Sequence, residues 1–279
     1  MENELHANIR FFIAGLKRSL FSKRYLYFII ITFLISVFSI NLLNAINQAT
    51  ISLSPEMLEV FKIGKAYNIG ILSVSNLNLS ETKNYDEIIV GILSGSFLIS
   101  IVASFVSLYI CSEFKNGYFV IALTHGQSRI SLINQYMCLS VISCLPILLI
   151  SIIGVITSMM INHLFAIKNP GYVIRTLILQ IFLILICSVC FSCVSLLFEK
   201  YKAVIICISS VLILPLIPGY MSIFFRGKVN IEKYMLLSMI INSQSITNSE
   251  ILNCIITAIF TGLLFYLTTF AILRKKRYE

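Results

Sequence analysis

The feature that most constrains this chain is a series of six apolar segments, each long enough to cross a lipid bilayer. A helix needs about 20 mostly apolar residues to cross a hydrocarbon core roughly 30 Å thick. Backbone polar groups inside lipid must be satisfied within the segment, so we expect helices. The six predicted spans are Tyr25–Leu43, Ile88–Cys111, Leu132–Ile161, Tyr172–Phe198, Ala203–Phe225 and Ile251–Leu273.

The overall composition points to the same environment. The 279 residues are 58% hydrophobic and 12% charged, whereas soluble domains contain about 25% charged residues. The mean hydropathy is +0.94. We therefore predict an all-α membrane protein, with residues 1–279 forming a single transmembrane domain.

The net charge of +9 does not indicate a nucleic-acid partner. The basic residues gather at the chain ends and at the ends of the apolar runs, where anionic lipid headgroups lie. Residues 1–24 combine Lys and Arg with apolar residues at helical spacing from Leu5 to Leu20. This pattern favours an amphipathic helix lying in the membrane interface. The alternative is a cytoplasmic tail that is helical only in part.

The orientation in the membrane follows from the distribution of Lys and Arg near the span ends. With the N-terminus inside, the first set consists of the inside segments, which carry Arg10, Lys17, Arg18, Lys23, Arg24, Lys115, Arg129, Lys200, Lys202, Arg274, Lys275, Lys276 and Arg277. The second set consists of the outside segments, which carry Lys62, Lys65, Lys83, Lys168, Arg175, Arg226, Lys228 and Lys233. The first set is larger and occupies less sequence, so we expect it, with both termini, to be cytoplasmic.

Several segments depart from simple spans. The third span is longer than a bilayer requires and contains Pro146, so we expect it to tilt, kink or extend beyond the membrane. Residues 44–87 form a long extracellular segment, either a cap of short helices or a loop. Pro215 and Pro218 interrupt the fifth span near its end, and residues 234–241 are apolar but too short to span. That last piece fits a re-entrant or surface-lying helix.

The second span carries two rows of small residues. Gly91 and Gly95 lie along one row, and Ser96, Ser100 and Ser104 lie along the next. Small residues four apart let helix backbones approach closely in lipid. These rows predict either packing inside one subunit, or a subunit interface or pathway lining.

Catalytic and metal-binding patterns are poorly represented. Cys187, Cys190 and Cys193 have metal-ligand spacing, but they spread over an apolar helix. The sequence has no second cluster of ligands that would complete a metal site with them. No carboxylate falls in the middle of a span, and the chain lacks a phosphate-binding loop with its Gly-Lys-Ser/Thr ending. We therefore predict no catalytic residue, no bound metal and no cofactor in this chain.

The segment Glu113–Arg129, between the second and third spans, has an unusual arrangement. Gly117 can break the helix leaving the membrane, and residues 118–125 are semi-apolar and compatible with a short helix. Gly126 can end that helix, and Ser128 can cap the one that follows. The segment is either a specialised contact surface or an ordinary cytoplasmic loop anchored by aromatic residues.

Glu113-x-x-x-Gly117 followed by Gly126-x-Ser128-Arg129, together with the six spans and the basic N-terminal helix, resembles a type-2 ATP-binding-cassette (ABC) transporter permease. In that family this loop contains a coupling helix that docks on a separate ATPase subunit. The resemblance implies that ATP and Mg²⁺ belong to that partner chain. It also implies a second permease copy, or a related permease, in the complex.

Carried over by position, the resemblance assigns Glu113, Gly117, Gly126 and Arg129 to shaping the coupling helix. It suggests Phe119, Ile121 and His125 as contacts to the ATPase. The Pro215–Pro218 region and residues 234–241 would close the outer side of the pathway, which the second and fifth spans would line. The long segment 44–87 departs from the family, where this connection is often shorter.

The function we expect is that of a permease subunit in an exporter, moving an amphiphilic cargo such as a peptide, an antimicrobial or a lipid-like molecule. The abundance of Ile, Asn, Ser and Lys is typical of AT-rich bacterial genomes, which suggests a bacterial cytoplasmic membrane. Two other classes stay open. One is a passive channel or secondary carrier, and the other is an assembly or sensory subunit that binds an ATPase without moving cargo.

Overall fold

The computed structural model describes residues 2–41, 62–63, 66–68, 73–74, 85–162, 167–198, 201–217 and 231–275. Its α-helices are α1 (Glu2–Leu20), α2 (Lys23–Val37), α5 (Tyr85–Ser94), α6 (Ser96–Lys115), α7 (Tyr118–Thr124), α8 (Arg129–Ile161), α9 (Pro170–Leu197), α10 (Tyr201–Ile213), α12 (Leu236–Ile241) and α13 (Asn248–Lys275). Two 3₁₀ turns, η1 (Ile231–Tyr234) and η2 (Ser243–Ser245), flank α12. The predominantly helical prediction is confirmed.

A small sheet is the one departure from the all-α prediction in the described residues. Strands β1 (Lys62–Ile63), β2 (Ala66–Asn68) and β3 (Ser73–Val74) pair antiparallel in that order. Two residues separate β1 from β2 in sequence, a spacing that favours a tight hairpin. The rest of segment 44–87, up to the start of α5, lies outside the described residues. The short helices suggested for this segment are therefore replaced, where it is described, by strands.

Four helical stretches are long and apolar enough to cross a membrane, judged by length and composition. They are Asp86–Lys115, Arg129–Ile161, Pro170–Leu197 and Asn248–Arg274. Helices α1 and α2 add a fifth if the two, which meet at a bend of 51°, count as one span. The described chain is thus compatible with a multi-pass membrane protein.

Two of the six predicted spans are interrupted in the structure. Helix α2 ends at Val37, after which residues 39–41 are again helical, and α10 ends at Ile213 after 13 residues. The end of α10 falls two residues before Pro215, which has no backbone N–H to continue the helix. The predicted interruption of the fifth apolar run is therefore confirmed, while residues 218–225 lie outside the described part.

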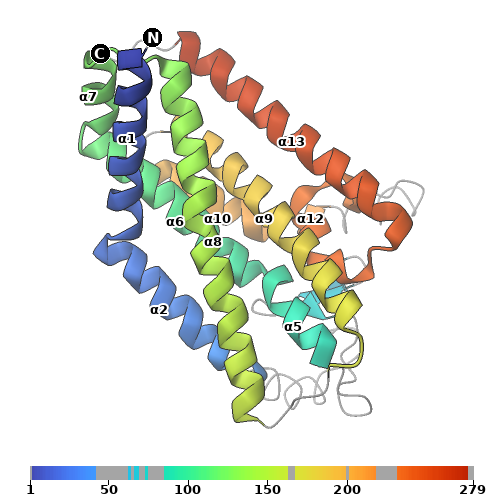
Figure 1. Ribbon diagram of the computed structural model, residues 1–279. Coiled ribbons are helices and arrows are strands. Elements are labelled where there is room, and N and C mark those ends of the chain that lie inside the picture. The colour runs from blue at the N-terminus through green and yellow to red at the C-terminus, as the bar shows by residue number, and fades with distance from the viewer. Residues whose placement is uncertain are drawn as a thin grey trace.

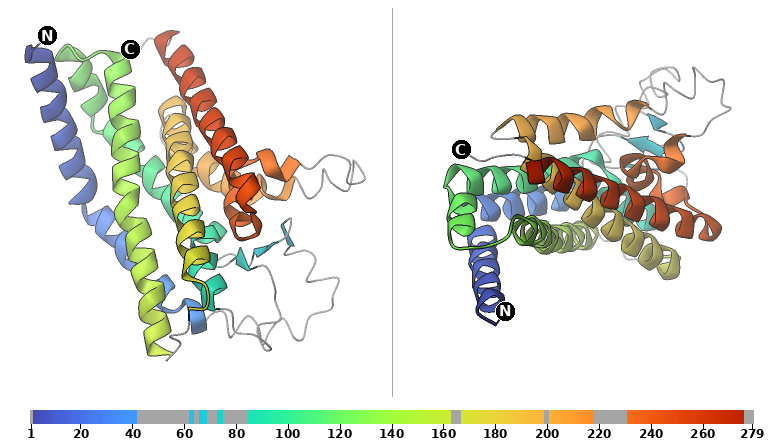
Figure 2. Two further views of the ribbon diagram at one scale, coloured as in Figure 1. Left: turned by 45° about the vertical axis from the view of Figure 1, so that its right-hand side comes forward. Right: turned by 90° about the horizontal axis from the view of Figure 1, so that it is seen from above.

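Helix α6 forms the centre of the bundle. The stretch Asp86–Lys115 is mostly buried, whereas only a small part of the apolar window in Asn248–Arg274 is covered by the chain. Helices α2 and α8 pack side by side, as do α10 and α6, and α13 and α9 (Figure 1). Seen from above, α1 projects from the side of the bundle (Figure 2).

Hydrogen bonds at one end of the bundle gather the starts of three helices. Asp86, near the start of α5, accepts from the backbone N–H groups of Lys168 (3.1 Å) and Asn169 (2.8 Å), just before α9. Arg175 of α9 donates to the carbonyl of Ile246 (3.3 Å), just before α13. We call this the Asp86 end.

The opposite end gathers the exit of α6, the start of α8 and the close of α13. Arg18 of α1 pairs with Glu113 near the end of α6. Arg129, the first residue of α8, donates to the carbonyl of Leu273 near the end of α13 (3.2 Å). This is the Glu113 end. Helix α1 begins and α13 finishes at this same end (Figure 1).

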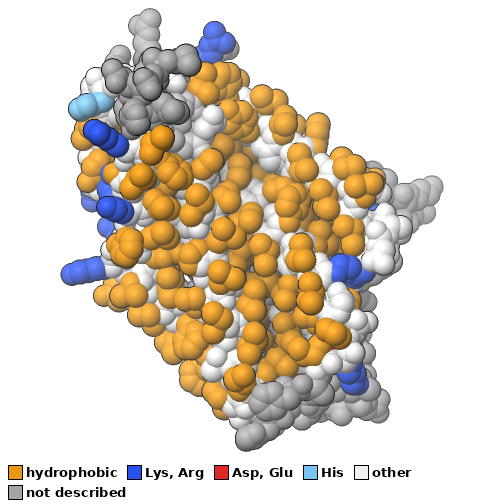
Figure 3. Space-filling model, viewed as in Figure 1, with side chains coloured by type: hydrophobic (Ala, Val, Ile, Leu, Met, Phe, Trp, Pro, Cys, Tyr) orange, Lys and Arg blue, Asp and Glu red, His pale blue; other side chains and the backbone are white. Residues whose placement is uncertain are grey.

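Charged side chains are segregated on the visible surface. On the face formed by α1, α8, α9 and α13, Lys and Arg lie along opposite edges, and an apolar surface continues between them (Figure 3). Among the exposed apolar residues of α8, α9 and α13 are Leu149, Ile153, Ile178, Ile256, Phe260 and Leu267. An apolar band between two basic rims is the pattern expected of a protein surrounded by lipid.

Close packing between α2 and α8 gives the first prediction. A Cβ added at Gly154 would lie 2.6 Å from the Cβ of Ser36 and 3.1 Å from the carbonyl oxygen of Phe33. Because backbone atoms cannot yield easily, Gly154→Ala should destabilise the protein by roughly 1–3 kcal/mol. Thermal unfolding of the purified chain in detergent measures this.

The matched control is Gly171→Ala. A Cβ there meets only Asn169 Oδ1, at 3.6 Å, which is ordinary contact. Equal melting temperatures for the two variants would contradict the close approach of α2 and α8.

Candidate functional site

The stretch between the second and third predicted spans folds as a short helix held between two left-handed glycines. Helix α6 ends at Lys115, and Gly117 has φ 71°. Helix α7 follows, and Gly126 has φ 83°. Positive φ strains residues with a Cβ, which explains glycine at both positions. The predicted break, short helix and helix end are confirmed.

Ser128 begins α8 as the sequence predicts. Its side chain accepts a hydrogen bond from the backbone N–H of Ser131 at 3.2 Å, which satisfies one of the unpaired donors at the helix start. At the end of α7, the N–H groups of Gly126 and Gln127 donate to the carbonyls of Leu123 (3.0 Å) and Ala122 (3.1 Å). The short helix is therefore closed at its C-terminus and followed directly by a capped one.

Helix α7 has a buried side and an exposed side. Phe119 is 1% exposed and packs against the rings of Phe114 (4.7 Å between centroids) and Tyr136 (6.1 Å). Val120 and Ile121 are 54% and 47% exposed. The resemblance suggests Phe119 as a contact to the ATPase, but its burial leaves it no surface to offer a partner. It anchors α7 instead.

The other residues that the resemblance suggests at this loop are more accessible than Phe119. His125 and Gly126 are exposed at the end of α7, and Ile121 shares the exposed side of the helix. Arg129 is half-buried and joins the start of α8 to the end of α13. We define the exposed side of α7 by Val120, Ile121 and His125 and call it the α7 face.

A buried ion pair underlies the α7 face. Arg18 Nε and Nη2 donate to Glu113 Oε1 (3.0 Å) and Oε2 (2.9 Å), a two-pronged pairing across 95 residues of sequence. The Tyr136 hydroxyl donates to Glu113 Oε2 at 3.4 Å. Glu113 is 3% exposed and Arg18 27%. Sequence reasoning missed this pair, since nothing in the pattern links the N-terminal helix to Glu113.

Aromatic rings complete the surroundings of Arg18. Its guanidinium carbon lies 4.2 Å from the centroid of the Tyr118 ring and 5.5 Å from that of Phe11. A cation over an aromatic face gains electrostatic stabilisation. Tyr118 is the first residue of α7, so Arg18 contacts both α6 and α7. We call Arg18, Glu113, Tyr118 and Tyr136 the Glu113 cluster.

The small residues of the second predicted span are less accessible than an interface requires. Gly91, Gly95 and Ser96 are buried within the chain, and Ser100 and Ser104 are half-buried. Ser100 and Ser104 donate to backbone carbonyls four residues earlier, at 2.8 and 2.7 Å. These positions fit packing inside one subunit better than a face shared with another.

Gly95 also separates α5 from α6, which the sequence did not predict. Its backbone is extended (φ −66°, ψ 135°), and it serves as the N-terminal cap position of α6.

Of the two prolines assigned to the pathway, Pro215 is buried and Pro218 lies outside the described residues.

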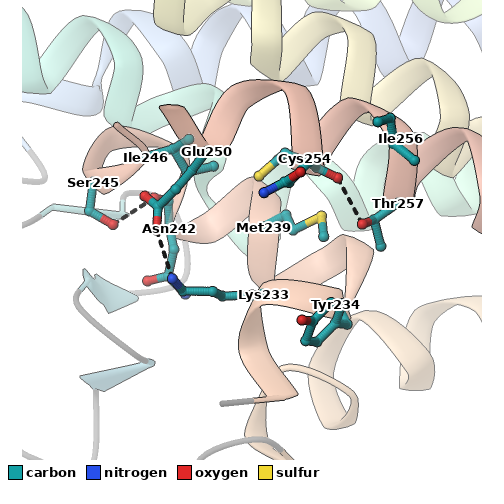
Figure 4. Close-up of a pocket in the computed structure, with 11 residues that line it drawn as sticks. Lys233, Tyr234, Met239, Asn242, Ser245, Ile246, Glu250, Cys254, Ile256 and Thr257 are labelled. Atoms are coloured by element: carbon teal, nitrogen blue, oxygen red, sulfur yellow. Dashed lines mark hydrogen bonds and ion pairs between the residues drawn. The ribbon is translucent and has the colours of Figure 1, made fainter. Parts of the chain in front are cut away.

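The Asp86 end has a cavity of its own, with a volume of 340 Å³ (Figure 4). Met239, Ile246 and Cys254 contribute apolar surface, and Asn242 and Asn253 contribute polar surface. The cavity lies between the α12 region, which the sequence suggested as a re-entrant piece, and the start of α13 (Figure 4).

An ion pair lies at this cavity. Lys233 Nζ lies 2.7 Å from Glu250 Oε1, and this hydrogen bond raises the pKa of Lys233. Both side chains are partly exposed, so the pair contributes little to stability. The cavity combines apolar and polar walls, and its two lining charges compensate each other.

Within the described residues no three His, Cys, Asp or Glu side chains are grouped so as to hold a metal ion. None of the eight cysteines, all of which are described, forms a disulfide. Cys187, Cys190 and Cys193 are buried in α9.

Comparison with protein-family models, with curated proteins and with solved structures finds no match to this chain.

The Arg18–Glu113 pair gives the second prediction. Arg18→Met should destabilise the protein by about 3 kcal/mol, because it leaves a buried carboxylate without its cation. Thermal or denaturant unfolding in detergent measures the loss. Adding Glu113→Met to Arg18→Met should restore part of the stability, since no unpaired charge then remains.

Arg10→Met is the control, because Arg10 is an exposed cation of the same helix. A loss at Arg10 as large as that at Arg18 would mean that the pairing itself is unimportant.

Proposed function

We propose that this protein is the membrane-spanning permease subunit of an ABC exporter, driven by a separate ATPase subunit that docks on the α7 face. The observation that carries this proposal is a short exposed helix built on a buried ion pair. Val120 and Ile121 are exposed apolar residues on α7, while Glu113 and Arg18 fix the base of the helix to α1 and α6.

The proposed six crossings follow from the ends of the helices. Helix α9 starts at the Asp86 end, and so does α13, because Arg175 bonds to Ile246 and Asn248 beside the start of α13. Both run toward the Glu113 end, so the chain between them has to return. Helix α10 supplies that return, even though only 13 of its residues are helical. Counting α2 as the first crossing, with α1 outside it, then gives six crossings.

The Glu113 end is cytoplasmic in this proposal. The basic residues of α1, the start of α8 and the end of α13 all lie there, which agrees with the rule that cytoplasmic segments are rich in Lys and Arg. Helix α1, bent by 51° from α2, is the interfacial helix. Both termini are then cytoplasmic, in the cytoplasmic membrane of a bacterium.

The contacts around α7 suggest how movement of an ATPase is transmitted. Phe119 and Tyr118 join α7 to Tyr136 of α8 and Arg18 of α1. Arg129 joins the start of α8 to the end of α13. A push on α7 therefore acts on several spans at once. Such a subunit needs two packing arrangements that the ATPase biases, and it needs no catalytic group of its own.

The cargo we propose is amphiphilic: a peptide, an antimicrobial or a lipid-like molecule. The band between the basic rims is apolar on the face shown in Figure 3, and the cavity at the Asp86 end has mixed walls. Two permease copies, or this chain with a related permease, would enclose the pathway.

Docking on the α7 face gives the third prediction. The double variant Val120→Asp, Ile121→Asp should reduce co-purification of the ATPase from native membranes roughly tenfold or more, because apolar anchors carry much of an interface's energy. These positions suit the test because their side chains are exposed, whereas Glu113 is buried. Mass spectrometry should identify the recovered partner by its phosphate-binding loop.

Tyr201→Asp is the control, because Tyr201 is 66% exposed beside the other predicted cytoplasmic connection. It should retain the ATPase. If tagged wild-type protein brings down no ATPase while remaining folded, the proposal is wrong.

The cargo class gives the fourth prediction. ATP hydrolysis by the purified complex should rise severalfold on addition of amphiphilic peptides or lipid-like compounds, because only cargo that fits an uncharged pathway shifts the conformational equilibrium. Hydrophilic sugars and amino acids serve as the comparison. Stimulation by the hydrophilic compounds alone would exclude an amphiphilic cargo.

A further inference from the structure

A second cavity lies beside the Glu113 cluster, at the corner between α1 and α2. Its volume is 450 Å³, and side chains of α1, α2 and α6 line it. Lys17, Lys23 and Arg24 contribute its basic side, and Phe28 and Phe105 contribute its apolar side. We call it the basic groove.

The three cations of the groove are not neutralised within the described chain. Lys17, Lys23 and Arg24 are exposed, and no described carboxylate pairs with them. Glu113 is the one acidic residue lining the groove, and Arg18 already pairs with it. The groove therefore presents an excess of three positive charges.

The apolar side of the groove continues into the surface of α2. The rings of Phe28 and Phe105 lie 5.7 Å apart, edge to face. Further along α2, Ile31 is 46% exposed and Ile35 is half-buried, and both lie on the same side of the helix as Phe28. A molecule seated at the cations can thus extend an apolar tail along α2 without crossing a polar surface.

We propose that the basic groove binds an anionic phospholipid, with the phosphate of its head group at Lys17, Lys23 and Arg24. One acyl chain lies against Phe28 and continues along α2 past Ile31. Lys and Arg are the usual partners of lipid phosphates at the cytoplasmic surface of a membrane. The observations that support the site are the cavity, the unneutralised cations and the apolar surface that leads away from them.

The charge of the groove also selects among lipids. Phosphatidylglycerol offers a net negative charge, whereas the choline group of phosphatidylcholine brings a positive charge toward three cations. The groove should therefore favour phosphatidylglycerol. An acidic protein would meet the cations but would leave the apolar surface along α2 uncovered.

The test uses the full chain purified in detergent, with lipid retention measured by native mass spectrometry. Wild type should retain added phosphatidylglycerol in preference to phosphatidylcholine. The triple variant Lys17→Gln, Lys23→Gln, Arg24→Gln should weaken phosphatidylglycerol binding on the order of a hundredfold, at roughly fivefold per cation. Equal retention of the two lipids by wild type would overturn the proposal.

A charge-matched control separates a specific site from general attraction. Arg10→Gln, Lys202→Gln, Arg274→Gln removes three exposed cations that do not line the groove. This variant should bind phosphatidylglycerol as wild type does. An equal loss in the two triple variants would mean that net charge alone attracts the lipid, and the groove proposal would be wrong.

Two further arms complete the test. The charge-conserving variant Lys17→Arg, Lys23→Arg, Arg24→Lys should keep binding, and failure of this variant while it stays folded would contradict a charge-based site. Inorganic phosphate at millimolar concentration should not displace phosphatidylglycerol. Displacement would assign the groove to a soluble phosphate instead. The proposal is independent of the ATPase partner, so it can fail or succeed whatever the pull-down shows.

Discussion

The structure at the Glu113 end depends on one buried ion pair. Burying a carboxylate costs several kcal/mol unless a partner and hydrogen bonds compensate for the lost water. Glu113 receives two bonds from Arg18 and a third from the Tyr136 hydroxyl. Because those partners come from α1 and α8, the bonds to Glu113 hold α1, α6 and α8 together. Helix α7 then rests on this base through Tyr118, whose ring lies under the Arg18 guanidinium.

Many serines satisfy their hydroxyls within their own helix. Ser100, Ser104, Ser140 and Ser192 each donate to the carbonyl four residues earlier in the same helix. This arrangement lets a hydroxyl reside in an apolar environment without a partner on another helix. Ser19 and Ser143 instead hydrogen-bond between α1 and α8, at 2.7 Å. The apolar band is therefore compatible with many serines, and its small side chains permit the close approach seen where Gly154 meets α2.

The α7 face and the basic groove share the Glu113 cluster as a common wall. Arg18 and Glu113 line the groove and also fix the base of α7. A lipid in the groove and an ATPase on α7 would therefore both contact elements that the Arg18–Glu113 pair joins. The cavity at the Asp86 end lies on the far side of the apolar band and shares no residue with this unit.

The sequence by itself determined the features that arise from local chemistry. Helical runs follow from apolar length, and the ends of α7 follow from Gly117 and Gly126, whose positive φ depends only on neighbouring backbone. The end of α10 before Pro215 has the same local origin. Only the tertiary structure decided which side chains are buried. Phe119 turned inward, and Arg18 met Glu113 across 95 residues of sequence. No local pattern encodes such pairings, because burial and partner choice depend on how distant helices pack.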